Sequence, residues 1–223
     1  MKLHRGEAFA LILVAAAFLM TAALYSRLPD RIPSHWNARG EVDAYSSKPF
    51  GPFVMPAVMA GLFLVFLALP SVSPRGFRFE RFRGVWVILQ CAILGFLLLI
   101  HTLLLLAAMG RPVDMVRGIE AGIGLLLAVV GNFLGKVTRN FFVGIRTPWT
   151  LASEEVWMRT HRLGGKLFVL AGLAMFALAL AGGGPIAMIV VVGAAALVSV
   201  VASYFIYRRI EGFKEDSRDD SAQ

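Results

Sequence analysis

Six long apolar segments constrain the fold of this chain more than any other feature of its sequence. They lie at residues 8–25, 53–69, 85–109, 119–134, 167–181 and 186–207. A helix that crosses a bilayer needs about 20 residues, so the fourth and fifth segments must extend into flanking residues such as Val116 and Leu163. The mean hydropathy of +0.73 also exceeds that of a soluble domain. We therefore predict an all-α membrane protein with six transmembrane helices.

The distribution of basic residues predicts how these helices are oriented in the membrane. With the amino terminus in the cytosol, 16 of the 22 Lys and Arg residues lie on the cytosolic side and 6 on the outer side. Because cytoplasmic loops carry the excess of positive charge, both termini are predicted to be cytosolic. The first segment could also be a cleavable signal peptide with a weak T-A-A site at residues 21–23, but its length favours an uncleaved span.

The formal net charge of +8 bears on the partners of the chain. Because its basic residues flank the apolar segments and form no single patch, we predict anionic membrane lipids as partners and no nucleic acid. The one cysteine, Cys91, lies in an apolar segment and is interpreted as a small packing residue. The chain then divides into residues 1–70, with two spans and an outer loop at 26–52, residues 71–207, with four spans and a cytosolic loop at 136–166, and residues 208–223, a charged tail predicted to be disordered.

The loop at 136–166 is the longest polar interval between apolar segments, and far longer than a simple helix connection requires. Gly144 and Pro148 punctuate it and predict an ordered turn around them. Thr150 or Ser153 is expected to cap the helix that follows, since a hydroxyl oxygen can accept from the first free backbone N–H groups. The loop is therefore predicted to be ordered.

The helix expected at 151–163 is amphipathic and is predicted to lie on the cytosolic membrane surface. Trp149 and Trp157 are expected at the level of the lipid headgroups, where aromatic residues are enriched. Gly164 and Gly165 are expected to end this helix before the fifth span begins.

This loop also carries a family resemblance. The run G-N-F-L at 131–134, followed by N-F-F-V-G-I-R-T-P-W-T-L-A-S-E-E-V-W-M-R-T-H-R-L-G-G-K at 140–166, resembles the signature of the SdpI family of bacterial membrane proteins. Some members of that family act as immunity proteins against a secreted toxin, and some hold a transcriptional repressor at the membrane. The candidate partner-binding residues are Asn140, Gly144, Arg146, Thr147, Pro148, Trp149, Thr150, Glu155, Trp157, Thr160, His161 and Arg162.

The charged side chains of the cytosolic loop have two interpretations. One is internal ion pairing, in which Arg146 and Glu154 or Glu155 tie the loop onto the bundle, while Glu155 and Arg159 pair along the helix four residues apart. The other is a site for an anionic partner, either lipid phosphate or an acidic face of a regulatory protein. This second site would use Arg146, Arg159, His161 and Arg162.

The outer loop carries a second resemblance. Its pattern L-P-x-x-I-P-x-H-W-x-x-x-G-x-x-D-x-x-x-x-K, at 28–48, resembles a small domain of unknown function found at the amino end of many bacterial membrane proteins. The prolines and glycine predict a compact, ordered loop, with Ile32 and Trp36 as its apolar anchors.

Two roles are considered for the polar and aromatic residues of the outer loop. The side chains of His35, Glu41 and Asp43 suit a divalent cation, but their irregular spacing favours hydrogen bonds that hold the loop together, so no metal is predicted. Binding of an external peptide through Trp36 and Tyr45 is a separate hypothesis. The outer-loop candidates are His35, Trp36, Asp43 and Lys48.

Gln90, His101 and Glu120 are the costly polar residues within the apolar segments. Gln90 and His101 are about three helical turns apart and share one face of the third span, which should point into the bundle. His101 and Glu120 are expected to differ in depth by roughly 9 Å and not to touch. A proton or ion path is one hypothesis; hydrogen bonding between helices, with Glu120 reaching toward Arg117, is the favoured one.

Three functions of different classes follow from these features. The resemblance implies a non-enzymatic protein that gives immunity to, or senses, a membrane-active peptide toxin on the outer side and tethers a transcriptional regulator on the cytosolic side. The alternative is a small transporter or channel that uses Gln90, His101 and Glu120. The third is a scaffold whose cytosolic loop binds only lipid or another membrane protein. Because no recognisable catalytic motif is present, neither enzymatic activity nor a cofactor is predicted.

Overall fold

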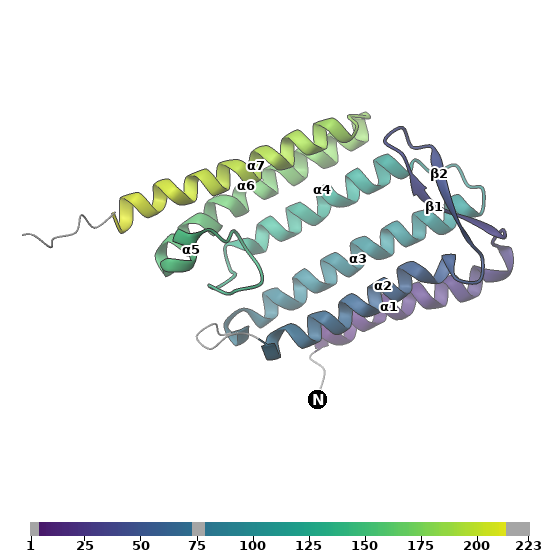
Figure 1. The fold of residues 1–223 in the computed structure, drawn as a ribbon, viewed down its shortest axis with the longest axis horizontal. Helices are drawn as coiled ribbons and strands as arrows, with labels where there is room; N and C mark the ends of the chain where they lie inside the picture. Colours follow the sequence, from purple (N-terminus) through teal and green to yellow (C-terminus); the bar gives the residue numbers. More distant parts are fainter. Residues whose placement is uncertain (1–4, 73–78, 213–223) are drawn as a thin grey trace, which may run out of the picture.

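The computed structural model describes residues 5–72 and 79–212 (Figure 1). Within these residues, six helices are long and apolar enough to cross a membrane, which confirms the predicted fold class and number of spans. Of the tail predicted to be disordered at 208–223, residues 208–210 belong to the last helix, and residues 213–223 lie outside the described part of the chain. The long helices are α1 (Arg5–Leu24), α2 (Gly51–Ala68), α3 (Arg83–Ala108), α4 (Met115–Leu134), α6 (Glu154–Ala181) and α7 (Pro185–Ile210).

Shorter elements connect the long helices. A two-stranded antiparallel sheet, β1 (Arg31–Trp36) and β2 (Val42–Ser47), lies between α1 and α2, and the short helix α5 (Pro148–Ala152) precedes α6. Three turns of 3₁₀-helix complete the described structure, at Tyr25–Arg27, Leu69–Val72 and Phe79–Phe82.

The helices form a row across the molecule (Figure 1). Helix α3 packs against α1, α2 and α4, α4 packs against α6, and α6 packs against α7. The β-hairpin lies at one end of this row, here called the hairpin end. Helix α5 lies at the opposite end, here called the motif end, and the loop at 136–153 that contains α5 is called the motif. The first residues of α1 and the last residues of α7 also lie at the motif end, as an even number of spans requires. Which end faces the cytosol remains a prediction from charge.

Helices α4 and α6 pack backbone to backbone through four glycines. A Cβ atom on Gly131 would lie 2.7 Å from the carbonyl oxygen of Gly165, and one on Gly172 would lie 2.5 Å from the carbonyl oxygen of Gly124. Gly124 and Gly131 are seven residues apart on α4, and Gly165 and Gly172 are seven residues apart on α6. Seven residues are close to two helical turns, so the two glycines of each helix lie on one face of it. Small residues allow such close approach, and van der Waals packing is a main source of helix association in lipid.

The predicted helix end at Gly164 and Gly165 is wrong, because α6 runs without interruption from Glu154 to Ala181. The helix predicted at 151–163 is therefore the first part of α6 and not a separate interfacial element. Glycine inside a helix costs about 1 kcal/mol relative to alanine, but breaking the helix within lipid would leave backbone groups unpaired at a higher cost. Here the missing side chains make room for α4 and for Ile145.

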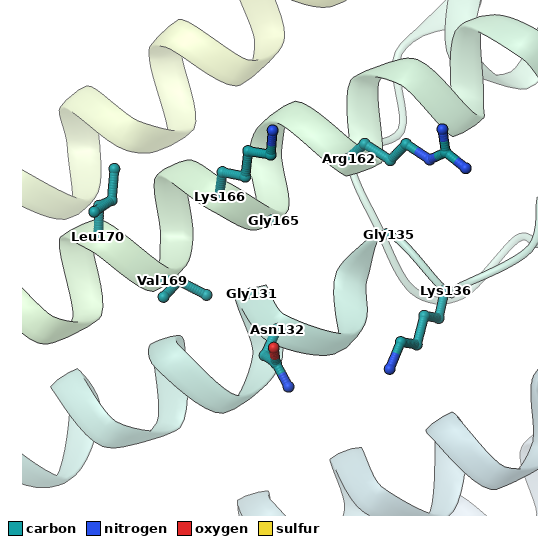
Figure 2. Close-up of a pocket in the computed structure, with 9 residues that line it drawn as sticks. All are labelled: Gly131, Asn132, Gly135, Lys136, Arg162, Gly165, Lys166, Val169 and Leu170. Carbon is teal, nitrogen blue, oxygen red and sulfur yellow. The ribbon is translucent and has the colours of Figure 1, made fainter.

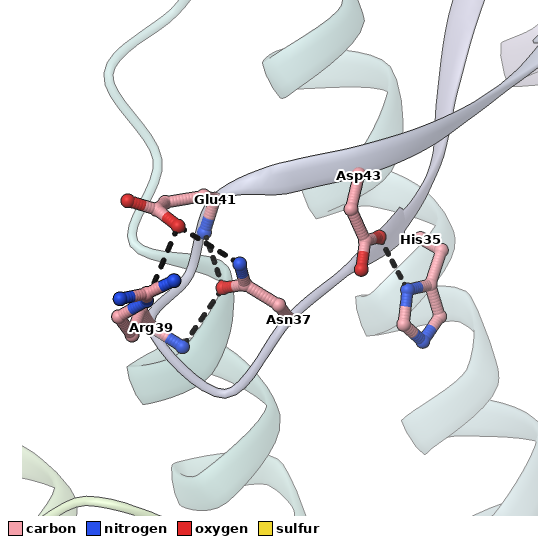
Figure 3. Close-up of polar contacts among 5 residues, drawn as sticks. All are labelled: His35, Asn37, Arg39, Glu41 and Asp43. Carbon is pink, nitrogen blue, oxygen red and sulfur yellow. Dashed lines mark hydrogen bonds and ion pairs between the residues drawn. The ribbon is translucent and has the colours of Figure 1, made fainter.

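The outer loop is ordered, as predicted, and its order comes from the β-hairpin. Arg31 pairs with Ser47 and Trp36 with Val42, and the side chain of Asn37 closes the turn by accepting from the N–H groups of Arg39 (2.9 Å) and Glu41 (3.1 Å) (Figure 3). Ile32 is fully buried in a small core that joins the hairpin to α3, so its predicted role as an anchor is confirmed. Trp36 is half-buried. The core of this end consists of Leu28, Ile32, Leu105 and Ala108.

Candidate functional site

The motif end begins with a turn that one buried side chain organises. Asn140 is fully buried, and its Nδ2 donates to the carbonyl oxygens of Thr138 (2.9 Å) and Val143 (3.0 Å). Its Oδ1 accepts from the backbone N–H groups of Phe142 (2.8 Å) and Val143 (2.7 Å). One amide thus satisfies four backbone groups that no helix or strand could pair, which explains how a non-helical segment can lie against the bundle.

Trp157 and His161, four residues apart on α6, contact the underside of this loop. Their rings are stacked, with centroids 3.9 Å apart. The Trp157 Nε1 donates to the carbonyl oxygen of Val137 at 2.8 Å, and the side chain is almost completely buried. Its indole closes the core between α6 and the turn, so Trp157 is interior to the protein, and its depth at the headgroup level stays a prediction.

His161 is also buried and joins α6 to the motif. The ring Nδ1 donates to the carbonyl oxygen of Trp157 at 2.7 Å, and Nε2 accepts from the N–H of Ile145 at 3.0 Å. Gly144 has a φ of +125°, and a Cβ there would overlap the imidazole ring. Only glycine fits this position, since both the backbone conformation and the space exclude a side chain. His161 is inside the protein and does not face the anionic partner considered for it.

Thr147 and Thr150 start α5 with a reciprocal cap. The backbone N–H of Thr147 donates to Thr150 Oγ1 at 2.9 Å, and that of Thr150 donates to Thr147 Oγ1 at 3.3 Å. Pro148 occupies the first turn, where its missing N–H costs nothing. Ser153 then caps α6, accepting from the N–H of Val156, as predicted. The motif is therefore locked in place by its own threonines and serine.

Helix α7 fixes the motif from the other side. The Nε1 of Trp149 donates to Ser203 Oγ at 2.6 Å, and Thr147 Oγ1 lies 3.2 Å from the same oxygen. The Trp149 ring also packs edge-on against Tyr204, with centroids 5.4 Å apart. Trp149 is thus half-buried between α5 and α7.

The charged residues of the motif face outward. Arg146 is exposed and donates through Nη1 to the carbonyl oxygen of Phe141 at 2.5 Å. Glu155 and Arg159 form the predicted ion pair along α6, also at 2.5 Å. Arg162 is exposed, whereas Thr160 is buried and its hydroxyl has no hydrogen-bond partner within the described structure. The candidates that remain accessible to a partner are Arg146, Pro148, Glu155 and Arg162.

At the hairpin end, the polar residues form two separate contacts (Figure 3). His35 Nδ1 lies 2.5 Å from Asp43 Oδ1, while Glu41 accepts from Asn37 Nδ2 at 2.8 Å and pairs with Arg39. Glu41 therefore does not join the other two into a metal-binding group, and the described residues contain no cluster of three such side chains. The geometry matches hydrogen bonds that hold the hairpin.

Lys48 ties the hairpin to the end of α1. Its Nζ donates to the carbonyl oxygen of Leu28 at 2.8 Å and lies 5.1 Å from the centroid of the Tyr25 ring. The two contacts fix the angle at which the hairpin leaves the bundle.

The three polar residues within the spans do not come together. His101 Nε2 lies 2.8 Å from the hydroxyl of Thr21 on α1, and Gln90 Nε2 donates to the carbonyl oxygen of Phe66 on α2 at 3.4 Å. Glu120 lines a small hollow beside Met175 on α6. His101 and Gln90 thus bond to two different helices, in keeping with hydrogen bonding between helices, whereas the Oε1 of the buried Glu120 has no hydrogen-bond partner within the described residues.

Several residues of these contacts were not singled out from the sequence. Thr21 is the hydrogen-bond partner of His101, and the hydroxyl of Ser203 contacts both Thr147 and Trp149. Ser199 and Ser203 are four apart, on one face of an otherwise apolar segment, and this spacing is a signal that could have marked the face of α7 that contacts the motif. The four glycines of α4 and α6 are likewise visible in the sequence as two pairs spaced seven apart.

Comparisons with known proteins cover both ends of the molecule. The profile of the SdpI/YfhL protein family matches residues 136–203, from the start of the motif to Ser203 on α7. The profile of a domain of unknown function matches residues 12–60, which include the hairpin. No solved structure matches the chain. The immunity protein SdpI of Bacillus subtilis (strain 168) is 33% identical over 204 residues, which span 91% of this chain and 96% of that protein. The chain therefore belongs to the SdpI/YfhL family, and is a multi-pass protein of the cytoplasmic membrane.

Proposed function

We propose that this protein confers immunity to a secreted, membrane-active peptide toxin, and that it does so by binding and not by catalysis. The observation that carries the proposal is the similarity to the immunity protein SdpI of Bacillus subtilis, which extends over almost the full length of both chains. A match of this extent includes the hairpin end and the motif end together. Both ends are therefore candidates for a part in the same function.

In the orientation predicted from charge, the hairpin end supplies the surface that a peptide arriving from outside would meet first. Tyr45 on β2 is 50% exposed, and Phe50, just after the hairpin, is 77% exposed. The guanidinium of Arg31 lies 4.8 Å from the centroid of the Tyr45 ring. Exposed aromatic side chains and arginine are the residue types that contribute most to binding of a protein or peptide partner.

The motif end has the properties of a rigid platform with a small exposed face. Its interior is held by Asn140 and His161. Arg146 and Phe141 are both exposed, Phe141 by 51%, and the Nη1 of Arg146 donates to the carbonyl oxygen of Phe141. An exposed cation and an exposed aromatic residue on one loop are suited to an acidic, partly apolar protein surface. We infer that a cytosolic regulator, where one is tethered, docks on this face.

A survival assay tests the immunity proposal. The protein is expressed in a toxin-sensitive bacterium, which is challenged with an SdpI-type killing peptide after equal membrane abundance has been verified. The wild type should protect. A Tyr45→Ala, Phe50→Ala variant should protect less, and an Arg39→Gln variant, altered at an exposed charge of the same hairpin, should protect like the wild type. Failure of the wild type to protect would exclude immunity to that peptide.

The regulator hypothesis has its own readout. Arg146→Ala and Phe141→Ala should leave protection intact but abolish retention of a regulator at the membrane, measured by its fraction in the membrane pellet with and without toxin. Loss of protection in these variants, at equal abundance, would instead place the motif face within the immunity mechanism.

A further inference from the structure

A hollow of about 670 Å³ opens between α4 and α6 at the motif end, apart from the buried network of the motif (Figure 2). Three cationic side chains stand around it, with Lys136 at the α4 wall and Arg162 and Lys166 on the α6 wall. Its walls include Gly131 and Gly165, the glycines through which the two helices are in close contact. Its lining consists of Gly131, Asn132, Gly135, Lys136, Arg162, Gly165, Lys166, Val169 and Leu170.

Within the described residues, no acidic side chain balances the charge of this groove. Its lining contains no carboxylate, and within residues 5–72 and 79–212 no carboxylate forms an ion pair with Lys136, Arg162 or Lys166. Lys136 lies 4.9 Å from the centroid of the Phe133 ring, a contact that leaves its charge in place. Arg159, only three residues before Arg162, is by contrast neutralised by Glu155. The lining of the groove therefore includes three basic side chains that form no ion pair with a carboxylate of the described structure.

The groove also changes from polar to apolar along α6. Arg162 and Lys166 are one helical turn apart, and Val169 and Leu170 follow on the next turn toward the centre of the helix. Val169 lies about 10 Å deeper along the helix axis than Arg162, at 1.5 Å per residue. A ligand that fits both parts must carry negative charge at one end and hydrocarbon at the other. Leu170 is 65% exposed, so the apolar part opens to the surroundings of the bundle.

We propose that this groove binds an anionic glycerophospholipid, with its phosphate among Lys136, Arg162 and Lys166 and an acyl chain against Val169 and Leu170. Basic pockets between transmembrane helices near the cytoplasmic surface are suited to anionic headgroups. A soluble protein partner would reach the cations but not Val169 and Leu170, because these two lie in the apolar segment 167–181 that is predicted to cross the membrane. Lipid is the occupant that satisfies both ends of the groove.

The wild-type protein provides the first test. The purified full-length chain in detergent is mixed with phosphatidylglycerol or phosphatidylcholine of identical acyl chains, and bound lipid is counted by native mass spectrometry. Phosphatidylglycerol should be retained at least about tenfold more than phosphatidylcholine, and should raise the thermal unfolding midpoint, since it binds the folded state. Equal retention of the two lipids would overturn the proposal. Inorganic phosphate should give neither effect; if it raised the midpoint as phosphatidylglycerol does, the groove would be a site for free phosphate.

A matched pair of charge variants provides the second test. One triple variant carries Lys136→Gln, Arg162→Gln and Lys166→Gln. It should weaken phosphatidylglycerol binding by on the order of 100-fold, because each Lys or Arg near an anionic headgroup contributes about fivefold in affinity. The control triple variant carries Arg159→Gln, Arg208→Gln and Arg209→Gln. It removes three exposed charges at the same end but outside the groove, and should leave the preference for phosphatidylglycerol over phosphatidylcholine unchanged. If both variants weakened phosphatidylglycerol binding equally, the binding would be a general electrostatic attraction to this end of the protein, and the proposed site would be overturned. Should the first variant fail to fold, Arg162→Gln alone decides, with an expected loss of about fivefold.

Discussion

The Nε2 of His161 accepts a hydrogen bond from the backbone N–H of Ile145 at 3.0 Å, while Nδ1 of the same ring donates to the carbonyl oxygen of Trp157. These two bonds together fix the tautomer: the proton is on Nδ1, and the imidazole is neutral. His161 thus joins the motif to α6 through a backbone group of the motif itself. Its part in the protein is to hold the shape on which any partner would dock.

Replacing His161 with leucine should therefore destabilise the protein. The N–H of Ile145 would lose its acceptor in a part-buried position, at a cost of about 1–3 kcal/mol. The thermal unfolding midpoint in detergent measures this. The neighbouring Arg162→Gln variant changes an exposed side chain and should leave the midpoint within error of the wild type in lipid-free detergent. A His161→Leu midpoint equal to that of the wild type would show that the bond carries no stability.

Asn140 is expected to be still more sensitive. Asn140→Ala removes the partners of four backbone groups and should lower the free energy of unfolding by about 2–4 kcal/mol. Asn140→Asp keeps the acceptor oxygen for Phe142 and Val143 but places a carboxylate against two carbonyl oxygens. Both variants should give a lower thermal midpoint than a Thr138→Ala control, whose hydroxyl has no hydrogen-bond partner in the described structure.

The glycine contact between α4 and α6 predicts opposite effects of one substitution at two positions. At Gly61 on α2 an added Cβ meets nothing within 4 Å, so Gly61→Ala should be neutral or stabilising by up to about 1 kcal/mol through helix propensity. At Gly172 a Cβ would lie 2.5 Å from two backbone atoms of α4, so Gly172→Ala should destabilise. Thermal midpoints of the two variants should move in opposite directions, and equal shifts would contradict the contact.

Ser203 and Ser199 allow a comparison on one face of α7. Ser203→Ala removes the acceptor of the Trp149 indole and a contact of Thr147, and should cost about 1–3 kcal/mol. Ser199 donates to the carbonyl oxygen of Ala195 on its own helix, a group that α7 already pairs, so Ser199→Ala should cost less. The difference between the two unfolding free energies reports how firmly α7 holds the motif.

A double-mutant cycle on Thr21 and His101 separates a structural from a pathway role. Thr21→Val and His101→Leu should each destabilise, and the double variant should lose less than the sum, with a coupling of about 0.5–2 kcal/mol from their shared hydrogen bond. Protection from toxin should follow the amount of folded protein in all three variants. Loss of protection by His101→Leu at normal folded abundance would show a role beyond the bond.

The six spans were predictable because each is a long apolar run that lipid forces into a helix. The hairpin was not predicted as strands, since Pro33 within R-I-P-S-H-W argues against a strand. The structure accommodates it beside an irregularity in the register between Pro33 and His35. Both strands belong to a sheet of only two, so each is an edge strand, and one edge of each can carry a residue without an N–H.

The candidate site was predictable in its residues and less so in their positions. Trp157 near a span boundary has the pattern of an interfacial aromatic residue, and only the packing of Val137 and the turn over α6 shows that it is interior. Gly164 and Gly165 have the pattern of a helix end for a similar reason. Their actual role, the close approach of another helix, depends on a neighbour that is distant in the sequence.

Because Gly131 and Gly165 hold α4 and α6 in contact close to where the motif leaves α4, the chain between these helices is anchored at both its ends to one solid unit. The motif therefore has little freedom to deform by itself. Any displacement of the motif relative to the rest of the bundle would therefore require the joined α4–α6 pair to move with it.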